Sequence, residues 1–305
     1  MNIVSLLPSA TEIVYALGLG DDLAAVTYEC DYPPDAQSKP VVVSTALPTE
    51  QPLPPGEIER LVRERMDQRE PIYDLDRDLI RRIQPDLILA QDLCRVCAVP
   101  SGHVQEALDS LGTTATLLSL DPDDLGGILD GIEQVGRATG TEARATELTS
   151  SLRERIKAVK ETAARLPTIR TFCLEWLDPP YAGGHWIPEM VELAGGENLV
   201  SQRGKPSRVV SWREIADAQP EVVVFMPCGY YLPEAEEEAA RIYAVPEFKE
   251  TSAYSAQNVL AVDASSFFSR PGPRIVDGLE ILAWAIHPDA FPEPPDGTVT
   301  RIARR

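Results

Sequence analysis

The sequence lacks the features of membrane and secreted proteins. No run of about 20 apolar residues is present, so no membrane-spanning helix is predicted. Met1 is followed directly by Asn2 and Ile3, with no basic leader and no cleavage motif. We therefore expect a cytoplasmic protein, and a periplasmic or extracellular one only if the chain is a processed form. The five cysteines are an odd number in 305 residues and resemble no disulfide framework, which fits a reducing compartment.

Basic residues are also scarce. The 28 Lys and Arg residues stand against 48 Asp and Glu residues, which gives a formal net charge of −20 and a pI near 4.5. Nucleic acid and anionic membrane surfaces are excluded as partners, because both require clustered cations.

Motifs of catalysis are missing as well. The sequence contains no nucleophile elbow, no phosphate loop, no glycine-rich dinucleotide fingerprint and no metalloprotease histidine pair. We therefore expect a binding protein and not an enzyme, although catalytic groups that converge only in space would escape this search.

Apolar runs separated by helical patterns predict an α/β protein with two Rossmann-like lobes and mostly parallel sheets. With 305 residues, 44% of them hydrophobic, the chain exceeds the usual size of one domain. Strands are expected at 3–7, 23–26, 41–43, 87–89 and 115–120, and then at 170–176, 222–225 and 259–262. We place the N-terminal lobe at 1–140, a connecting helix at 141–167, the C-terminal lobe at 168–290 and a tail at 291–305.

Two helices can be predicted in more detail. Ser9 and Glu12 have the spacing of a capping box, which predicts a helix that starts at Ala10 and ends at Gly18. Over 141–165, apolar residues recur at spacings of three and four: Ala145, Leu148, Leu152, Ile156, Val159 and Ala163. A helix of about 24 residues, roughly 36 Å long, can join two lobes as a stiff strut or lie on the surface of one.

The two lobes share a short repeated pattern. Residues 84–90 (QPDLILA) are echoed by residues 219–225 (QPEVVVF), and a cysteine follows each run within a few residues. The repeat indicates two variants of one plan, although the same order of helix, proline, acid and buried strand occurs in unrelated α/β proteins.

Aromatic and sulfur-bearing side chains follow several of the predicted strands. Because ligand-facing loops leave the carboxyl ends of parallel strands, these residues are candidate ligand contacts. Only 6% of the residues are aromatic, so their concentration there favours a stacking surface for a bulky ligand, although single rings can instead wedge loops onto the core. His185, after two glycines and before a predicted helix, joins them. The candidates are Tyr28, Glu29, Cys30, Cys94, Cys97, Trp176, His185, Trp186, Cys228, Tyr230, Phe267, Phe268 and Arg270.

The cysteines leave three possibilities open. Cys94 and Cys97 have the spacing of a metal-chelating or dithiol pair. Together with Cys30 and Cys228 they form a candidate metal or iron–sulfur site, which would give the protein a redox or enzymatic role. The thiols can also contact a metal carried by the ligand, or be inert.

Five segments together resemble the cobalamin and iron-siderophore binding proteins of ABC importers. They are residues 3–12 (IVSLLPSATE), 30–34 (CDYPP), 84–88 (QPDLI), 192–198 (ELAGGEN) and 270–274 (RPGPR). The likeness extends from Ile3 to about His287, and its closest form is the set of cobalamin-binding proteins.

The resemblance implies a class III periplasmic-binding-protein fold, with two lobes, one long connecting helix and a shallow cleft that closes little. It implies non-catalytic binding of a cobalamin-like corrinoid in that cleft, no required cofactor, and a monomer that serves an ABC permease. An iron siderophore or haem is the alternative ligand, and an intracellular corrinoid carrier the alternative role.

The resemblance also suggests roles for single residues. Phe267 stands where the family has a ligand-contacting ring, whereas Glu29 replaces a tyrosine of the cobalamin binder. Asp78, and within one residue Glu214, match the acidic residues that dock the family's proteins on the permease. Both can equally be solvated helix charges.

Overall fold

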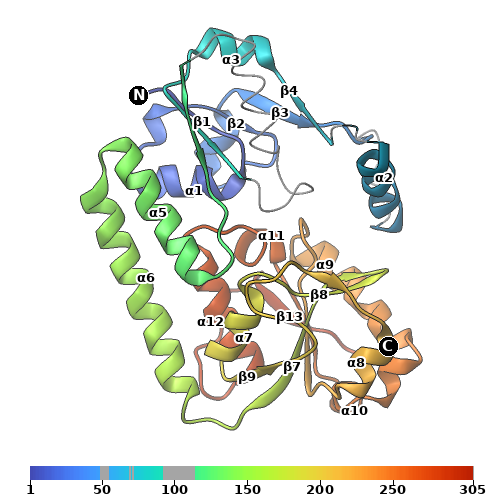
Figure 1. The fold of residues 1–305 in the computed structure, drawn as a ribbon. Coiled ribbons are helices and arrows are strands. Elements are labelled where there is room, and N and C mark those ends of the chain that lie inside the picture. The colour runs from blue at the N-terminus through green and yellow to red at the C-terminus, as the bar shows by residue number, and fades with distance from the viewer. Residues whose placement is uncertain (49–54, 69, 71, 92–113, 305) are drawn as a thin grey trace. The chain divides into compact units, whose positions relative to one another are not determined.

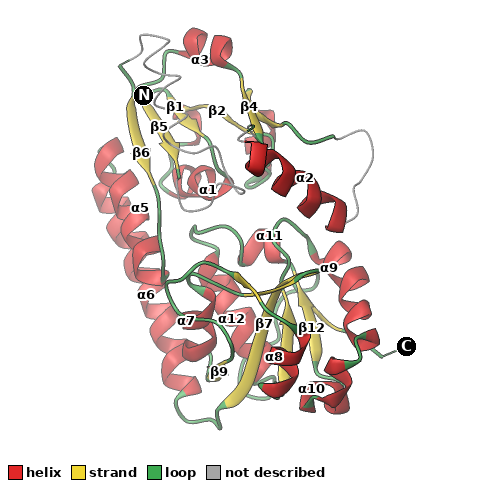
Figure 2. Cartoon of the chain, turned by 45° about the vertical axis from the view of Figure 1, so that its right-hand side comes forward, coloured by secondary structure: helices red, strands yellow, loops and turns green. Residues whose placement is uncertain are grey.

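The computed structural model describes residues 1–48, 55–68, 70, 72–91 and 114–304. The chain forms two compact units. The N-terminal unit consists of Met1–Pro122 and Leu129–Thr149, and the C-terminal unit consists of Asp123–Ile128 and Ser150–Arg305. Each unit is built on its own sheet, which is coloured yellow in Figure 2.

The sheet of the N-terminal unit has six strands in the described part of the chain, in the order β4-β3-β2-β1-β5-β6. Neighbouring strands are parallel except for β3 and β4. The bounds are β1 Ile3–Ser5, β2 Leu23–Thr27, β3 Val41–Thr45, β4 Tyr73–Leu75, β5 Leu87–Ala90 and β6 Thr116–Ser119. Every strand predicted for the first lobe is present, and β4 is an unpredicted addition at the edge.

The sheet of the C-terminal unit follows the order β10-β8-β7-β11-β12-β13, and β9 pairs with β7. Strands β7, β9, β11 and β12 pair in parallel, whereas β8, β10 and β13 are added antiparallel. The bounds are β7 Ile169–Leu177, β8 Pro180–Ala182, β9 Gly196–Asn198, β10 Arg208–Val209, β11 Val222–Phe225, β12 Val259–Val262 and β13 Val299–Arg301. The expected tail at 291–305 is thus wrong in part, because β13 covers the edge of β12 and Ile302 is buried.

The helices flank these sheets (Figure 1). Their bounds are α1 Pro8–Ala16, α2 Pro55–Gln68, α3 Arg77–Ile83, α5 Leu125–Thr139, α6 Glu142–Ala163, α7 Ile187–Leu193, α8 Trp212–Asp217, α9 Leu232–Ala239, α10 Ser252–Ala256, α11 Ala264–Phe267 and α12 Ile275–Ile286. The predicted capping box at Ser9 is wrong: α1 begins two residues before the expected Ala10, at Pro8, whose fixed φ and missing N–H suit the first helical position. The predicted end at Gly18 is confirmed by its φ of 72°.

A long helix, α6, lies within the segment predicted as the connecting helix. Its 22 residues correspond to about 33 Å at 1.5 Å per residue. Ala145, Leu152, Val159 and Ala163 are buried, as their spacing predicts. Residues up to Thr149 belong to the N-terminal unit and those from Ser150 to the C-terminal unit, so one continuous helix contributes to both.

The repeated sequence pattern has the same local structure in both units. Gln84 and Gln219 each follow a helix in the left-handed conformation, with φ of 51° and 48°. Each side chain donates back to a carbonyl three residues earlier, at 2.7 Å in the first unit and 2.8 Å in the second. The acidic residue two positions after each glutamine accepts a hydrogen bond from a backbone N–H at the start of a neighbouring strand. The N–H of Asn2 donates to Asp86, and the N–H of Arg170 donates to Glu221.

Candidate functional site

Two exposed tyrosines follow β2 in the N-terminal unit. The strand ends at Thr27, and Tyr28 and Tyr32 in the next loop are each 46% exposed. Between them Glu29 is half-buried, and its backbone N–H donates to Thr27 Oγ1 at 3.0 Å. This loop therefore presents two aromatic rings and a carboxylate at the carboxyl end of a parallel strand.

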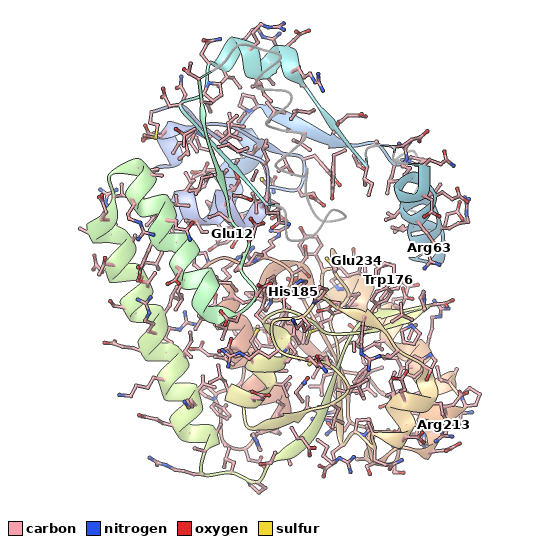
Figure 3. The ribbon with its side chains drawn as sticks, in the orientation of Figure 1. Glu12, Arg63, Trp176, His185, Arg213 and Glu234 are labelled. Atoms are coloured by element: carbon pink, nitrogen blue, oxygen red, sulfur yellow. The ribbon has the colours of Figure 1, made fainter. Side chains whose placement is uncertain are left out.

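Aromatic rings also follow β7 and β11 in the C-terminal unit. Trp176 lies near the end of β7 and meets Tyr230 edge to face, with ring centroids 5.6 Å apart. Tyr231, the next residue, is 38% exposed. Burial, reinforced by Glu238 and Glu234, raises the pKa of Tyr230 to about 12, so this phenol stays protonated at neutral pH. Figure 3 places Trp176, His185 and Glu234 at the same edge of the C-terminal unit.

Four predicted contacts are buried instead. Cys30 lies inside the N-terminal unit, with its Sγ 3.1 Å from Thr11 Oγ1. In the C-terminal unit, Trp186 Nε1 donates to the carbonyl of Phe268 at 2.9 Å, and both side chains are buried. Arg270 is buried as well. Since these four groups expose little surface, they shape the strand-end loops and offer a ligand little area to contact.

Two arginines lie between α11 and α12. Arg270 Nη2 lies 3.4 Å from both the Tyr231 hydroxyl and Ser265 Oγ. The guanidinium of Arg274 lies over the half-buried ring of Phe267, 5.6 Å from its centroid. One face of Phe267 is thus covered by a cation within the same unit.

His185 has an unusual backbone and an unpaired ring nitrogen. Its φ is 50°, in the left-handed region that residues other than glycine rarely adopt. In the part of the chain that the structure describes, its Nε2 is buried without a hydrogen-bond partner. Burial lowers the pKa of the imidazole, partly opposed by Asp123, so His185 is neutral at neutral pH.

The candidate metal site stays a prediction. Cys94 and Cys97 lie outside the described residues, Cys30 is buried in the N-terminal unit and Cys228 is exposed in the C-terminal unit. Among the described residues, no group of three or more His, Cys, Asp or Glu side chains could hold a metal ion. Cys173 is buried in β7, and burial raises the pKa of its thiol.

The two candidate docking acids have different surroundings. Asp78, on α3, is exposed and accepts from Arg81 at 2.7 Å. Glu214 forms a capping box at the start of α8: Ser211 Oγ accepts from its N–H, and its carboxylate accepts from the N–H of Ser211 at 2.8 Å. These bonds lower the pKa of Glu214. The carboxylate of Glu214 therefore already has a structural role, and docking by either residue stays a prediction.

Sequence reasoning missed the groups that hold these loops in place. Glu175 accepts from the N–H of Gly184 at 3.2 Å and from the hydroxyl of Ser207. Glu189 and Arg203 form an ion pair at 2.7 Å. None of these residues belongs to a motif, and the pairs are distant in sequence, so a single sequence carries no signal for them.

Comparison with known proteins identifies the family. The profile of the periplasmic binding proteins matches residues 3–265, which is most of the chain. The chain belongs to the periplasmic binding protein family. The resemblance inferred from the five sequence segments is confirmed, as is the expectation of a binding protein that is not an enzyme.

Three relatives of this family member are informative. The vitamin B12-binding protein of Vibrio cholerae is 28% identical over 284 residues, which cover 92% of this chain and 86% of that protein. The crystal structure of the periplasmic vitamin B12-binding protein of Vibrio cholerae matches with a TM-score of 0.68 at 26% identity, covering 93% of this chain and 96% of that one. An uncharacterised ABC transporter substrate-binding lipoprotein of Bacillus subtilis is 25% identical over 298 residues, covering 96% of this chain and 82% of that protein.

These matches confirm the expected two-lobe α/β fold of class III type. They also support a substrate-binding component of an ABC importer, a role in which a small molecule and a permease are the partners.

The expected cytoplasmic location is wrong. The Vibrio protein is periplasmic and the Bacillus protein is a lipoprotein, so the periplasmic or extracellular alternative fits the family. The role as an intracellular carrier is contradicted with it. Among the described residues, no helix has both the length and the apolar character to cross a bilayer.

Proposed function

We propose that this periplasmic binding protein binds a cobalamin-like corrinoid and delivers it to an ABC importer. The observation that carries the proposal is the similarity to the vitamin B12-binding protein over 92% of the chain. Exposed tyrosines after parallel strands in both units add support.

Energetics make the tyrosines suitable for this role. A corrin is a bulky macrocycle with apolar edges, and covering a half-exposed ring removes on the order of 50–100 Å² of apolar surface from water. At about 25 cal/mol per Å², each ring would contribute roughly 1–2.5 kcal/mol. Tyr28 and Tyr32, in the same loop after β2, would together contribute roughly 2–5 kcal/mol of the about 8 kcal/mol that a micromolar affinity requires.

Charge favours a corrinoid over haem as the ligand. The exposed tyrosines have acidic neighbours: Glu29 lies between Tyr28 and Tyr32, and Glu234 lies in the first turn of α9, shortly after Tyr231. In the C-terminal unit, Arg270, whose guanidinium lies beside the Tyr231 hydroxyl, is buried. Haem carries two propionates, whereas the corrin side chains of cobalamin end in uncharged amides, so acidic surroundings repel the first ligand more than the second.

A ligand panel tests the proposal. Purified protein is mixed with cyanocobalamin, aquocobalamin, hemin or a ferric trihydroxamate, and binding is followed by the ligand's absorption spectrum and by tryptophan fluorescence. We expect both corrinoids to bind at micromolar concentration or below, and hemin to bind at least tenfold more weakly. Tighter binding of hemin or of the ferric chelate would overturn the assignment of the ligand while leaving the family role in place.

A further inference from the structure

The loop at residues 201–207, which we name the strap, is anchored at both ends inside the C-terminal unit. Near its start, Arg203 Nη2 lies 2.7 Å from Glu189 Oε1 and 3.4 Å from Asp124 Oδ2. At its other end, the Ser207 hydroxyl donates to Glu175. The strap therefore has one polar anchor on α7 and the start of α5, and another on β7.

The middle of the strap holds the backbone of His185. The N–H of His185 donates to the carbonyl of Lys205 at 2.6 Å, and the N–H of Gly204 donates to the carbonyl of His185 at 3.0 Å. Gly184 lies directly against the strap, since a Cβ there would come within 2.2 Å of the backbone nitrogen of Ser207. His185 keeps its left-handed φ of 50° between these contacts, and a conformation of this kind persists only where its surroundings enforce it.

The first anchor also fixes the first turn of α5. Glu189 uses its second oxygen, Oε2, to accept the N–H of Leu125 at 2.9 Å, and Asp124 Oδ1 accepts the N–H of Gly127 at 2.8 Å. Asp123–Ile128 belongs to the C-terminal unit, although the rest of α5 belongs to the N-terminal unit. One carboxylate, Glu189, thus bonds both to the strap and to the segment through which the chain passes from one unit into the other.

We propose that Arg203 is a positioning residue for His185. Through its ion pair with Glu189, Arg203 fixes the strap to the first turn of α5, and the strap in turn holds the backbone of His185. Loss of the Arg203 contacts frees the start of the strap, the two backbone bonds to His185 lose their support, and the half-buried imidazole becomes more exposed to solvent. The relevance of this positioning to binding rests on the proposed function, because His185 is a candidate ligand contact. The positioning itself is a property of the ligand-free protein and can be measured without a ligand.

The test compares Arg203→Met with Arg213→Met in the full chain. Arg213 is a matched control, because it is 51% exposed against 50% for Arg203 and also bonds two carboxylates, Asp217 at 2.9 Å and Glu250 at 2.8 Å. It lies at the opposite end of the C-terminal unit from His185 (Figure 3). Hydrogen exchange by mass spectrometry is read on peptides covering 123–128, 183–187 and 201–207, and modification of His185 by diethyl pyrocarbonate gives the reactivity of its ring.

We expect Arg203→Met to speed exchange in all three peptides and modification of His185 by about tenfold, and Arg213→Met to leave these rates within twofold of the parent. Arg203→Lys, which keeps a charge but has no planar fork, should give an intermediate rate. Unchanged rates at His185 in Arg203→Met, with a melting temperature lowered as much as in Arg213→Met, would overturn the proposal. Should Arg203→Met fail to fold, Ser207→Ala removes the other anchor and must raise the His185 rates.

The two proposals fail independently of each other. A chain that binds no corrinoid but shows the expected exchange pattern would sink the proposed function alone. A chain that binds corrinoids with unchanged exchange in Arg203→Met would sink the positioning role alone.

Discussion

At the scale of single residues, solvent exposure divides the aromatic side chains near the strand ends into two groups. Tyr28, Tyr32 and Tyr231 keep much of their surface in water, whereas Trp186 and Phe268 are buried and joined by a hydrogen bond. An exposed ring can still stabilise a complex, because a ligand that covers it removes apolar surface from water. A buried ring already has its surface covered in the folded protein and adds little to binding. The first group therefore carries the binding predictions.

Replacing an exposed ring should weaken corrinoid binding without unfolding the protein. We expect Tyr28→Ala and Tyr231→Ala each to raise the Kd for cyanocobalamin about tenfold, which corresponds to about 1.4 kcal/mol. Val209→Ala is the control, since Val209 is also exposed but lies on the edge strand β10. Calorimetric titration measures all three, and a tyrosine variant that binds like the Val209 control would remove that ring from the site.

The half-buried imidazole of His185 should make the free energy of unfolding depend on pH. Burial lowers its pKa below the usual 6.5, so the unfolded chain binds more protons as pH falls through 6.5 and the folded protein loses stability there. We expect the parent to lose more stability than His185→Gln between pH 7.5 and 5.5 in urea titrations. The other titrating groups are common to both proteins and cancel in this comparison, so an equal loss would contradict a neutral, half-buried His185.

The solvent exposure of the aromatic side chains could not be predicted from the sequence. Composition and position after a strand predicted where the aromatic residues lie, but exposure depends on packing partners far away in the chain. Trp186 is buried because its indole reaches Phe268, 82 residues later. The hydrogen bonds between Glu189 and Leu125 and between Ser207 and Glu175 also join residues far apart in the sequence, and no local sequence pattern predicts them.

At the scale of helices and strands, local patterns predicted the buried parallel strands and α6, because continuous apolar runs and spacings of three and four report burial directly. The short antiparallel strands β4, β8, β10 and β13 were missed, since strands of two or three residues carry too few positions to show a period. The capping box was expected at Ser9 and instead occurs at Ser211. Pro8 explains the first difference by starting α1 itself.

The capping box of α8 should be measurable as stability. Ser211→Ala removes the acceptor for the N–H of Glu214 and should lower the free energy of unfolding by about 1 kcal/mol. Ser211→Thr keeps a hydroxyl at the cap and should cost less than half as much. Urea denaturation gives both values, and equal effects of the two substitutions would show that volume at this position matters more than the cap.

At the scale of the whole molecule, two units with one local plan form a single binding protein. Both place a glutamine in the left-handed conformation before the same Pro-acid-strand sequence, and both use the acid to fix the start of a neighbouring strand. The repeat was visible in the sequence because it is local. The ligand was not, because a fold does not determine which molecule its site binds.

Calorimetric titration of the full chain with cyanocobalamin measures the central claim most directly. The account predicts one corrinoid bound per chain with a Kd of about 1 μM or lower, together with a shift in the corrinoid absorption bands. No heat and no spectral change at 100 μM cyanocobalamin, in a preparation that folds and binds another metal chelate, would contradict it.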